Sequence, residues 1–167
     1  MSAPDRDGFE SFVVARRSAL LRTAYLLTGN AADAEDLVQV ALVRTVPHWH
    51  KIHTDAEAYV RRVLVRESVS RWRARRWREV TSARLPDAVA PANDQDELIV
   101  LREALSELAP RQRAVIVLRY FEDLTERQTA EALGISVGTV KSQARDALAR
   151  LRALLPDVEE LPAVTRS

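Results

Sequence analysis

The sequence predicts an all-α protein of two small helical domains, joined by a flexible linker, with a helix-turn-helix at the end of the second domain. Apolar residues recur at helical spacing, without the alternation that is typical of strands. Glycine is scarce, with four among 167 residues, and helix-forming residues are abundant. Residues 81–95 contain Pro86 and Pro91 and lack a periodic apolar stripe, which predicts the linker.

The first predicted domain, residues 1–80, has a short polar tail and three helices. Gly29 or Asn30 suits the left-handed position that ends the first helix, and Pro47 stops the second. Thr54 is the predicted N-cap of the third helix. The expected helices are about 9–27, 32–46 and 54–78.

The second predicted domain, residues 96–155, is a four-helix unit. Its first helix is expected at about 96–108, and Pro110 suits the first position of the next one. The tail that follows, residues 156–167, is expected to be poorly ordered.

Residues 125–152 predict two helices joined by a tight turn. Thr125 and Gln128 form a capping-box pattern, Gly134 suits a left-handed C-cap, and Ser136 caps the second helix. That helix has an apolar stripe and an opposite face of hydrogen-bond donors and cations, which is typical of a major-groove reader. The alternative is an ordinary helical hairpin in a core. The residues predicted to contact DNA are Thr139, Lys141, Ser142, Gln143 and Arg145.

The net charge is only +1, but the charges are segregated along the chain. Residues 61–78 hold eight arginines and one acid, residues 87–107 six acids and one arginine, and residues 137–152 four cations and one acid. Two basic blocks around an acidic one predict two nucleic-acid-facing surfaces, one on each side of the connector. We also hypothesise that the acidic segment 94–107 masks the basic faces in the free protein.

The second half of the third helix interleaves arginines with Trp72 and Trp77. Arginine neutralises phosphates and indole rings stack on unpaired bases, so this helix suits single-stranded or melted DNA. The alternative is that a tryptophan, above all Trp72, packs against the first two helices. The residues assigned to this contact are Arg61, Arg62, Arg66, Trp72, Arg73, Arg75, Arg76 and Trp77.

Polar residues also gather in the first turns of the second helix. Asp33, Glu35, Asp36 and Gln39 lie there, where the positive end of the helix dipole favours acids. Local physics alone therefore predicts a solvated helix start.

Several other classes of protein are disfavoured. The absence of cysteine argues against disulfides and thiolate metal sites. His48, His50 and His53 have neither the spacing nor an acidic partner for a metal site, and Trp49 among them is expected to be a core or hinge aromatic. No apolar run approaches membrane-spanning length, and no catalytic constellation is present. We therefore expect a cytoplasmic, non-enzymatic protein without metal or cofactor.

Three stretches together resemble the extracytoplasmic-function sigma factors, the small two-domain sigma subunits of bacterial RNA polymerase. They are ADAEDLVQ (32–39), LSELAPRQRAVIVLRYFEDLT (105–125) and LGISVGTVKSQ (133–143), in this order around a linker. The resemblance covers residues 9–155 and is strongest to a compact actinobacterial-type subgroup.

The resemblance implies a factor that binds core RNA polymerase and promoter DNA. The second helix would bind the coiled coil of the β′ clamp. The resemblance therefore implies that the acids of this helix contact a protein partner, in place of the solvated helix start that local physics predicts. The arginine–tryptophan helix would recognise and melt the −10 element, and the helix-turn-helix would read the −35 element. The β flap and an anti-sigma factor are further implied partners. The implied clamp-binding residues are Asp33, Glu35, Asp36, Leu37 and Gln39.

Three residues depart from the family pattern. Val40 replaces a common acid at the edge of the docking surface, and Arg66 replaces a common asparagine, so no −10 base preference carries over. Asp146 replaces a common basic residue and is expected to accept from Gln143, Arg150 or a cytosine amine. The alternative function is a helix-turn-helix activator or repressor that binds DNA without docking on the polymerase. The first domain discriminates the two, because such regulators lack the docking stretch.

Overall fold

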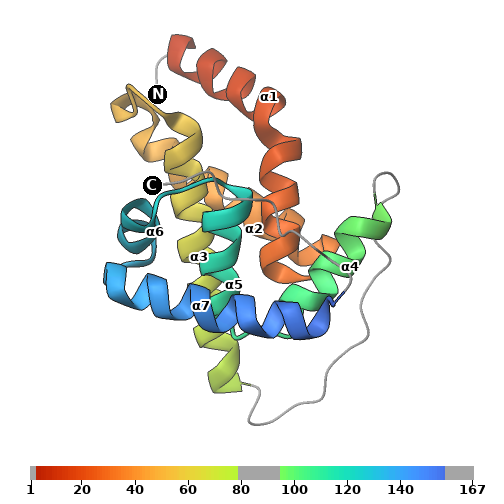
Figure 1. Ribbon diagram of the computed structural model, residues 1–167. Helices are drawn as coiled ribbons and strands as arrows, with labels where there is room; N and C mark the ends of the chain where they lie inside the picture. The colour runs from red at the N-terminus through yellow and green to blue at the C-terminus, as the bar shows by residue number, and fades with distance from the viewer. Residues whose placement is uncertain (1–2, 79–94, 157–167) are drawn as a thin grey trace.

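The computed structural model describes residues 3–78 and 95–156, which form helices joined by short turns (Figure 1). The all-α prediction is confirmed in these ranges. The predicted linker, 81–95, lies outside them except for its last residue, and so does the tail beyond residue 156. The first domain contains α1 (Ala3–Thr28), α2 (Ala31–Thr45), the 3-10 segment η1 (Val46–Lys51) and α3 (Ala56–Arg78); the second contains α4 (Gln95–Ser106), α5 (Pro110–Ile116), the π-helical segment η2 (Val117–Phe121), α6 (Glu126–Leu133) and α7 (Val137–Leu154).

The first domain differs from the sequence-based expectations at its helix ends. The expected polar tail is already helical from residue 3. Gly29 takes the left-handed conformation that ends α1, with φ +84°. Oδ1 of Asp55 accepts a backbone N–H of the first turn of α3 at 2.9 Å, so Asp55 caps this helix and the prediction of Thr54 is wrong. Trp49, in η1, is half-buried and packs edge-on against Phe9 with ring centroids 5.1 Å apart.

The caps of the helix-turn-helix are confirmed. Oγ1 of Thr125 accepts the backbone N–H of Gln128 at 3.1 Å, and Oε1 of Gln128 accepts that of Thr125 at 2.9 Å. Gly134 ends α6 with φ +65°, a conformation in which a Cβ is strained. Oγ of Ser136 accepts the backbone N–H of Thr139 at 3.1 Å. These caps fix where α7 begins, and therefore which of its residues face outward.

The end of α5 departs from a regular α-helix. Its last turn widens into η2, a π-helical segment of the kind often found at functional positions. The backbone N–H of Glu122 donates to the carbonyl of Val117 at 3.0 Å, and Asp123 takes a left-handed φ of +51°. The apolar periodicity does not predict this turn, which places Glu122 against the first domain.

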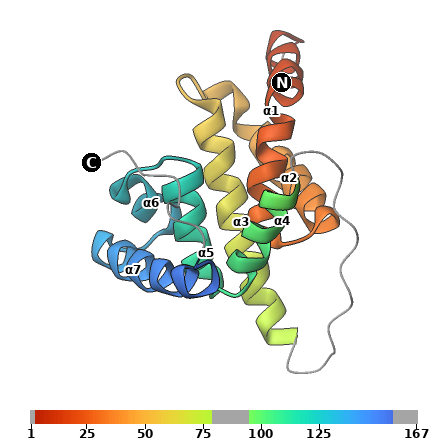
Figure 2. The same cartoon turned by 45° about the vertical axis from the view of Figure 1, so that its right-hand side comes forward.

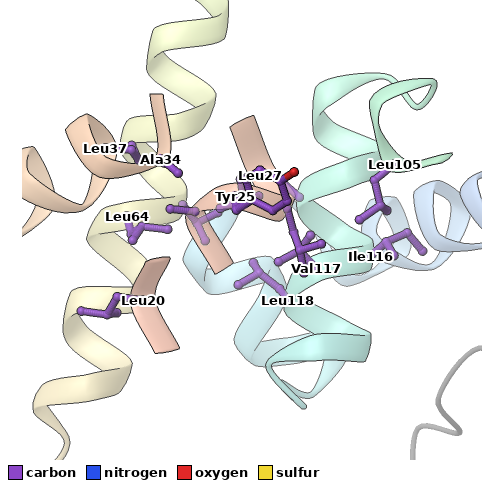
Figure 3. Close-up of a cluster of buried hydrophobic side chains, with 14 of the residues drawn as sticks. Leu20, Tyr25, Leu27, Ala34, Leu37, Leu64, Leu105, Ile116, Val117 and Leu118 are labelled. Carbon is purple, nitrogen blue, oxygen red and sulfur yellow. The ribbon is translucent and has the colours of Figure 1, made fainter. Parts of the chain in front are cut away.

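The two domains pack directly on one another. Buried side chains of α1, α2 and α3 belong to one hydrophobic cluster with those of the second domain (Figure 3). Leu27 of α1, Leu64 of α3 and Val117 of η2 are examples, exposed by 4%, 0% and 0%. Figure 2 shows α4 lying against α1 and α5 lying beside α3. The described residues thus form one compact body.

Arginines of the second domain hold the end of α1. Arg113 of α5 donates to the carbonyls of Leu105 at 2.8 Å and Leu27 at 3.0 Å, and Arg102 of α4 donates to that of Gly29. Burial lowers the pKa of Arg113 from its ordinary value. Because the last carbonyls of a helix lack intrahelical donors, these guanidinium groups satisfy them across the domain boundary.

Candidate nucleic-acid and polymerase interfaces

The face predicted to read duplex DNA lies on α7, where Lys141 and Arg145 are exposed and Thr139, Ser142 and Gln143 are half-buried. At 100° per residue, Ser142 lies opposite the buried stripe of this helix. Thr139 and Gln143 lie on one side of Ser142, and Lys141 and Arg145 lie on the other. The Lys141 and Arg145 side chains are 62% and 78% exposed. The five predicted residues therefore surround the outward side of one helix, with Lys141 and Gln143 at its two edges beside the buried stripe.

Asp146 interacts differently from the expectation. Its Oδ1 lies 3.5 Å from Nε of Arg145, with side chains 59% and 78% exposed, so it pairs with Arg145 and not with Gln143 or Arg150. The other alternative, acceptance from a cytosine amine, stays a prediction. An ion pair this exposed contributes little to stability. Asp146 therefore lowers the local positive charge without fixing the Arg145 side chain.

The arginines in the first half of α3 face the second domain. Nη2 of Arg61 lies 2.8 Å from Oε1 of Glu57, and its Nε pairs with Glu122 across the domain boundary. Nε of Arg66 donates to the carbonyl of Ala132 at 3.2 Å. The remaining predicted residues lie on α3, but their side chains are outside what the structure describes: Trp72, Arg73, Arg75, Arg76 and Trp77.

Among the acids whose side chains the structure describes, those that pair with α3 across the domain boundary do not belong to the hypothesised masking segment. The side chains of Asp94, Asp96 and Glu97 of that segment lie outside the described residues. Glu103 and Glu107, in the segment 94–107, are exposed. Glu122 and Glu131 pair with α3 instead. Their positions follow from the turn after η2 and from the packing of α6, which charge counting along the sequence cannot locate.

The exposed side of α2 carries three of the predicted docking residues. Glu35, Asp36 and Gln39 are exposed. Glu35 pairs with Arg17 of α1, and Oδ2 of Asp36 lies 2.7 Å from Nη1 of Arg71. Asp36 remains 62% exposed within its pair, so it is open to a partner.

Two other predicted docking residues make contacts inside the first domain. Leu37 is 0% exposed in the core, so the prediction that it contacts a partner directly is wrong. Its burial follows from the helical stripe that it shares with Ala41. Asp33 is half-buried, and its Oδ2 accepts from Nδ2 of the N-cap residue Asn30 at 2.7 Å.

One surface residue was missed. Val43 is 63% exposed and lies four residues after Gln39 and seven after Asp36, on the same side of α2. Helical spacing from the predicted acids could have found it. Its apolar side chain adds apolar area to the same side of the helix, next to the exposed polar residues.

Clusters of metal-ligating side chains and membrane-spanning helices are absent from the part of the chain that the structure describes. Within residues 3–78 and 95–156, no three histidine, cysteine or acidic side chains gather as a metal ion requires. No helix in that part of the chain is long and apolar enough to cross a bilayer.

Comparisons with known proteins match both domains. The sigma-70 region 2 model matches residues 12–78, and the sigma-70 region 4 model matches residues 98–151. The RNA polymerase sigma-E factor of Streptomyces avermitilis is 47% identical over 148 residues, which cover 86% of this chain and 83% of that protein. The ECF RNA polymerase sigma factor SigL of Mycobacterium tuberculosis is 33% identical over 153 residues, which cover 84% and 85%.

Solved structures match the same arrangement. The structure of the sigma factor RpoE in complex with the anti-sigma factor NepR from Bartonella quintana aligns with TM-score 0.75 and 26% identity, over 92% of this chain and 99% of that chain. The structure of SigJ from Mycobacterium tuberculosis aligns with TM-score 0.64 and 28% identity, over 85% and 52%. Two helical domains, matching sigma-70 regions 2 and 4, define a promoter-directing factor. The chain belongs to the extracytoplasmic-function sigma factors of the sigma-70 family.

Proposed function

We propose that this sigma factor divides its work between the two domains. The first docks on core RNA polymerase through α2 and binds the −10 element through α3, and the second reads the −35 element through α7. One observation carries the proposal. Docking acids and reading cations are open to solvent on separate domains of one chain, as in Asp36 and Lys141, which are both 62% exposed.

The chemistry of α7 fits a major groove. A short side chain, Ser142, lies at the centre of its outward side and lets the helix approach base edges closely. Lys141 and Arg145 flank it and can neutralise phosphates or bind guanine. Gln143, on the other side, has the donor and acceptor pair that suits adenine.

The chemistry of α2 fits a basic helical partner. Glu35, Asp36 and Gln39 supply negative charge and hydrogen-bonding groups, and Val43 adds apolar area in line with them. Acids with an apolar contact suit the coiled coil of the β′ clamp, because complementary charge steers association and apolar area holds the complex. Val40, half-buried beside them, supplies no further acid.

The remaining assignments follow from this role. We propose that the chain supplies no catalytic group of its own and works in the cytoplasm, where the polymerase acts. The second domain would contact the β flap. An anti-sigma factor is a candidate regulator, by analogy with NepR, which is bound to the sigma factor RpoE in the matched structure.

Size-exclusion chromatography with purified core polymerase tests the docking step. The chain should co-elute with core enzyme, and the isolated β′ coiled coil should compete with it. A chain that binds promoter DNA but never co-elutes with core polymerase would be a helix-turn-helix regulator instead.

A further inference from the structure

Arg145 and Asp146 lie side by side at the middle of the outward side of α7, opposite its buried stripe. At 100° per residue, they lie about 60° and 40° to either side of Ser142, about one turn further along the helix. Lys141 and Gln143, at the two edges, lie about 100° from Ser142. A helix that enters a major groove with Ser142 foremost therefore brings both charged side chains to the base edges.

The outward side carries small residues before and after this pair. Gly138 and Ala149 are exposed, and both lie within about 40° of Ser142 around the helix axis. A Cβ added at Gly138 would meet Oγ of Ser136 at 3.8 Å, an ordinary contact within the same turn. Short side chains at these positions let the helix approach a groove closely, which the short side chain of Asp146 requires.

The two charged groups of the pair are open to a ligand. Oδ1 of Asp146 lies 3.5 Å from Nε of Arg145, and the side chains are 59% and 78% exposed. An exposed ion pair contributes little to stability, so DNA can separate the two groups at small cost. Lys141, by contrast, pairs with Glu126 of α6 at 3.7 Å, at the edge of the outward side.

A carboxylate at this place restricts which DNA can bind. Phosphates repel it, and it loses water when the helix enters the groove, so a hydrogen-bond donor must replace that water. The amino donors in the major groove are N4 of cytosine and N6 of adenine. Beside N6, adenine carries the acceptor N7, which repels the second oxygen of a carboxylate. Cytosine has no such acceptor and therefore suits Asp146 better.

We propose that Arg145 and Asp146 together read one G·C base pair of the −35 element. The guanidinium of Arg145 donates to O6 and N7 of guanine, and the carboxylate of Asp146 accepts from N4 of the paired cytosine. O6 and N4 are neighbours on the major-groove edge of this base pair, as the guanidinium and carboxylate are neighbours on α7. The proposal rests on the proposed function, which places α7 on the −35 element.

The paired contact makes recognition depend on the orientation of the base pair. In the reversed C·G pair, the carboxylate of Asp146 meets the acceptors O6 and N7, and the guanidinium of Arg145 meets the donor N4. Two repulsive contacts then replace two complementary ones. We expect the G·C orientation to be preferred over C·G about tenfold, as is typical of one good base contact.

The base preference of the holoenzyme tests this contact. The full chain is combined with purified bacterial core polymerase. The template library is derived from one promoter that the wild-type holoenzyme uses, with its −35 region randomised and a transcribed barcode that identifies each template. Sequencing of the transcripts then gives the preference at every −35 position. The test variants are Arg145→Ala and Asp146→Ala. Arg111→Ala and Glu107→Ala are the matched controls, because they remove an exposed cation and an exposed acid from the same domain outside α7.

The wild-type holoenzyme should prefer G·C at one position about tenfold over C·G. Each test variant should reduce this preference to about twofold or less at that same position, because each loses one half of the paired contact, and should keep the preferences at the other positions. Both controls should keep the whole profile. The substituted side chains are exposed, so the variants should fold, which circular dichroism checks.

Three results would overturn the paired contact. The two test variants could change different positions, or leave the profile unchanged, or raise transcription from all templates equally, as expected if Asp146 only repels phosphates. If the wild-type holoenzyme selects a −35 sequence in such a case, only the paired contact fails. If the wild-type holoenzyme selects no −35 sequence, the role of α7 in the proposed function fails, and the paired contact fails with it.

Discussion

Arg61 of α3 and Glu122 at the end of η2 form an ion pair between the two domains, with side chains 18% and 11% exposed. The same guanidinium lies 2.8 Å from Glu57, one turn earlier on α3. Arg61 is therefore held by two carboxylates, one from each domain. Any partner that needs this arginine must replace the carboxylate of Glu122.

The reading role of α7 can be tested at its two cations. We expect Lys141→Ala or Arg145→Ala to lower transcription from −35-dependent promoters about tenfold, because each removes a phosphate or base contact. Core binding should be unchanged. Arg111→Ala, which removes an exposed cation from the start of α5 in the same domain, is the control. An equal loss of core binding in the α7 variants would refute the assignment.

The docking role of α2 can be tested by reversing one charge. Asp36→Arg should abolish co-elution with core polymerase, because it places a cation against a basic partner. The variant should fold, since the exposed pair with Arg71 contributes at most about 1 kcal/mol. Asp7→Arg makes the same charge change at an exposed position of α1. Co-elution of the Asp36 variant as strong as that of wild type would rule out this surface.

Val43 provides a test at a residue that the sequence analysis missed. Val43→Lys should weaken core binding about tenfold, or about 1.4 kcal/mol, with little change in thermal stability. Val14→Lys is the matched control, because Val14 of α1 is an exposed valine as well, at 84% against 63% for Val43. Equal core affinities of the two variants would exclude Val43 from the interface.

Substitutions of Leu37 distinguish a structural role of this residue from a direct contact with the polymerase. Leu37→Ala should lower the free energy of unfolding by about 2–5 kcal/mol, because it leaves a cavity in the core. Leu37→Met should cost less than about 1.5 kcal/mol and keep full core binding. Chemical denaturation and co-elution measure the two effects. A Leu37→Met variant that folds but does not bind core polymerase would show that Leu37 contacts the polymerase directly.

Much of the fold could be predicted because its signals are local. Capping residues such as Thr125 and Ser136, and the left-handed Gly134, act within a few residues of the helix ends that they define. The outward side of α7 followed from the same periodicity. The prediction that Thr54 is the N-cap of α3 was wrong because its neighbour Asp55 has a side chain that is equally suitable for capping. Only the path of the backbone selects between the two.

The contact between the domains could not be predicted in the same way. Arg61 and Glu122 are far apart in sequence, and η2, which aims Glu122, breaks the helical period. Leu37 was placed on the docking surface by the family resemblance, although its apolar spacing already indicated the core. Val43 was missed because the stretch that carries the family resemblance, and from which the docking residues were taken, ends at residue 39.

The most direct test of the account is run-off transcription on a pool of genomic DNA fragments, with purified bacterial core RNA polymerase in the presence and absence of the chain. We predict initiation at a defined set of promoters only when the chain is present, and loss of that set with Asp36→Arg. The same initiation pattern with and without the chain would contradict it.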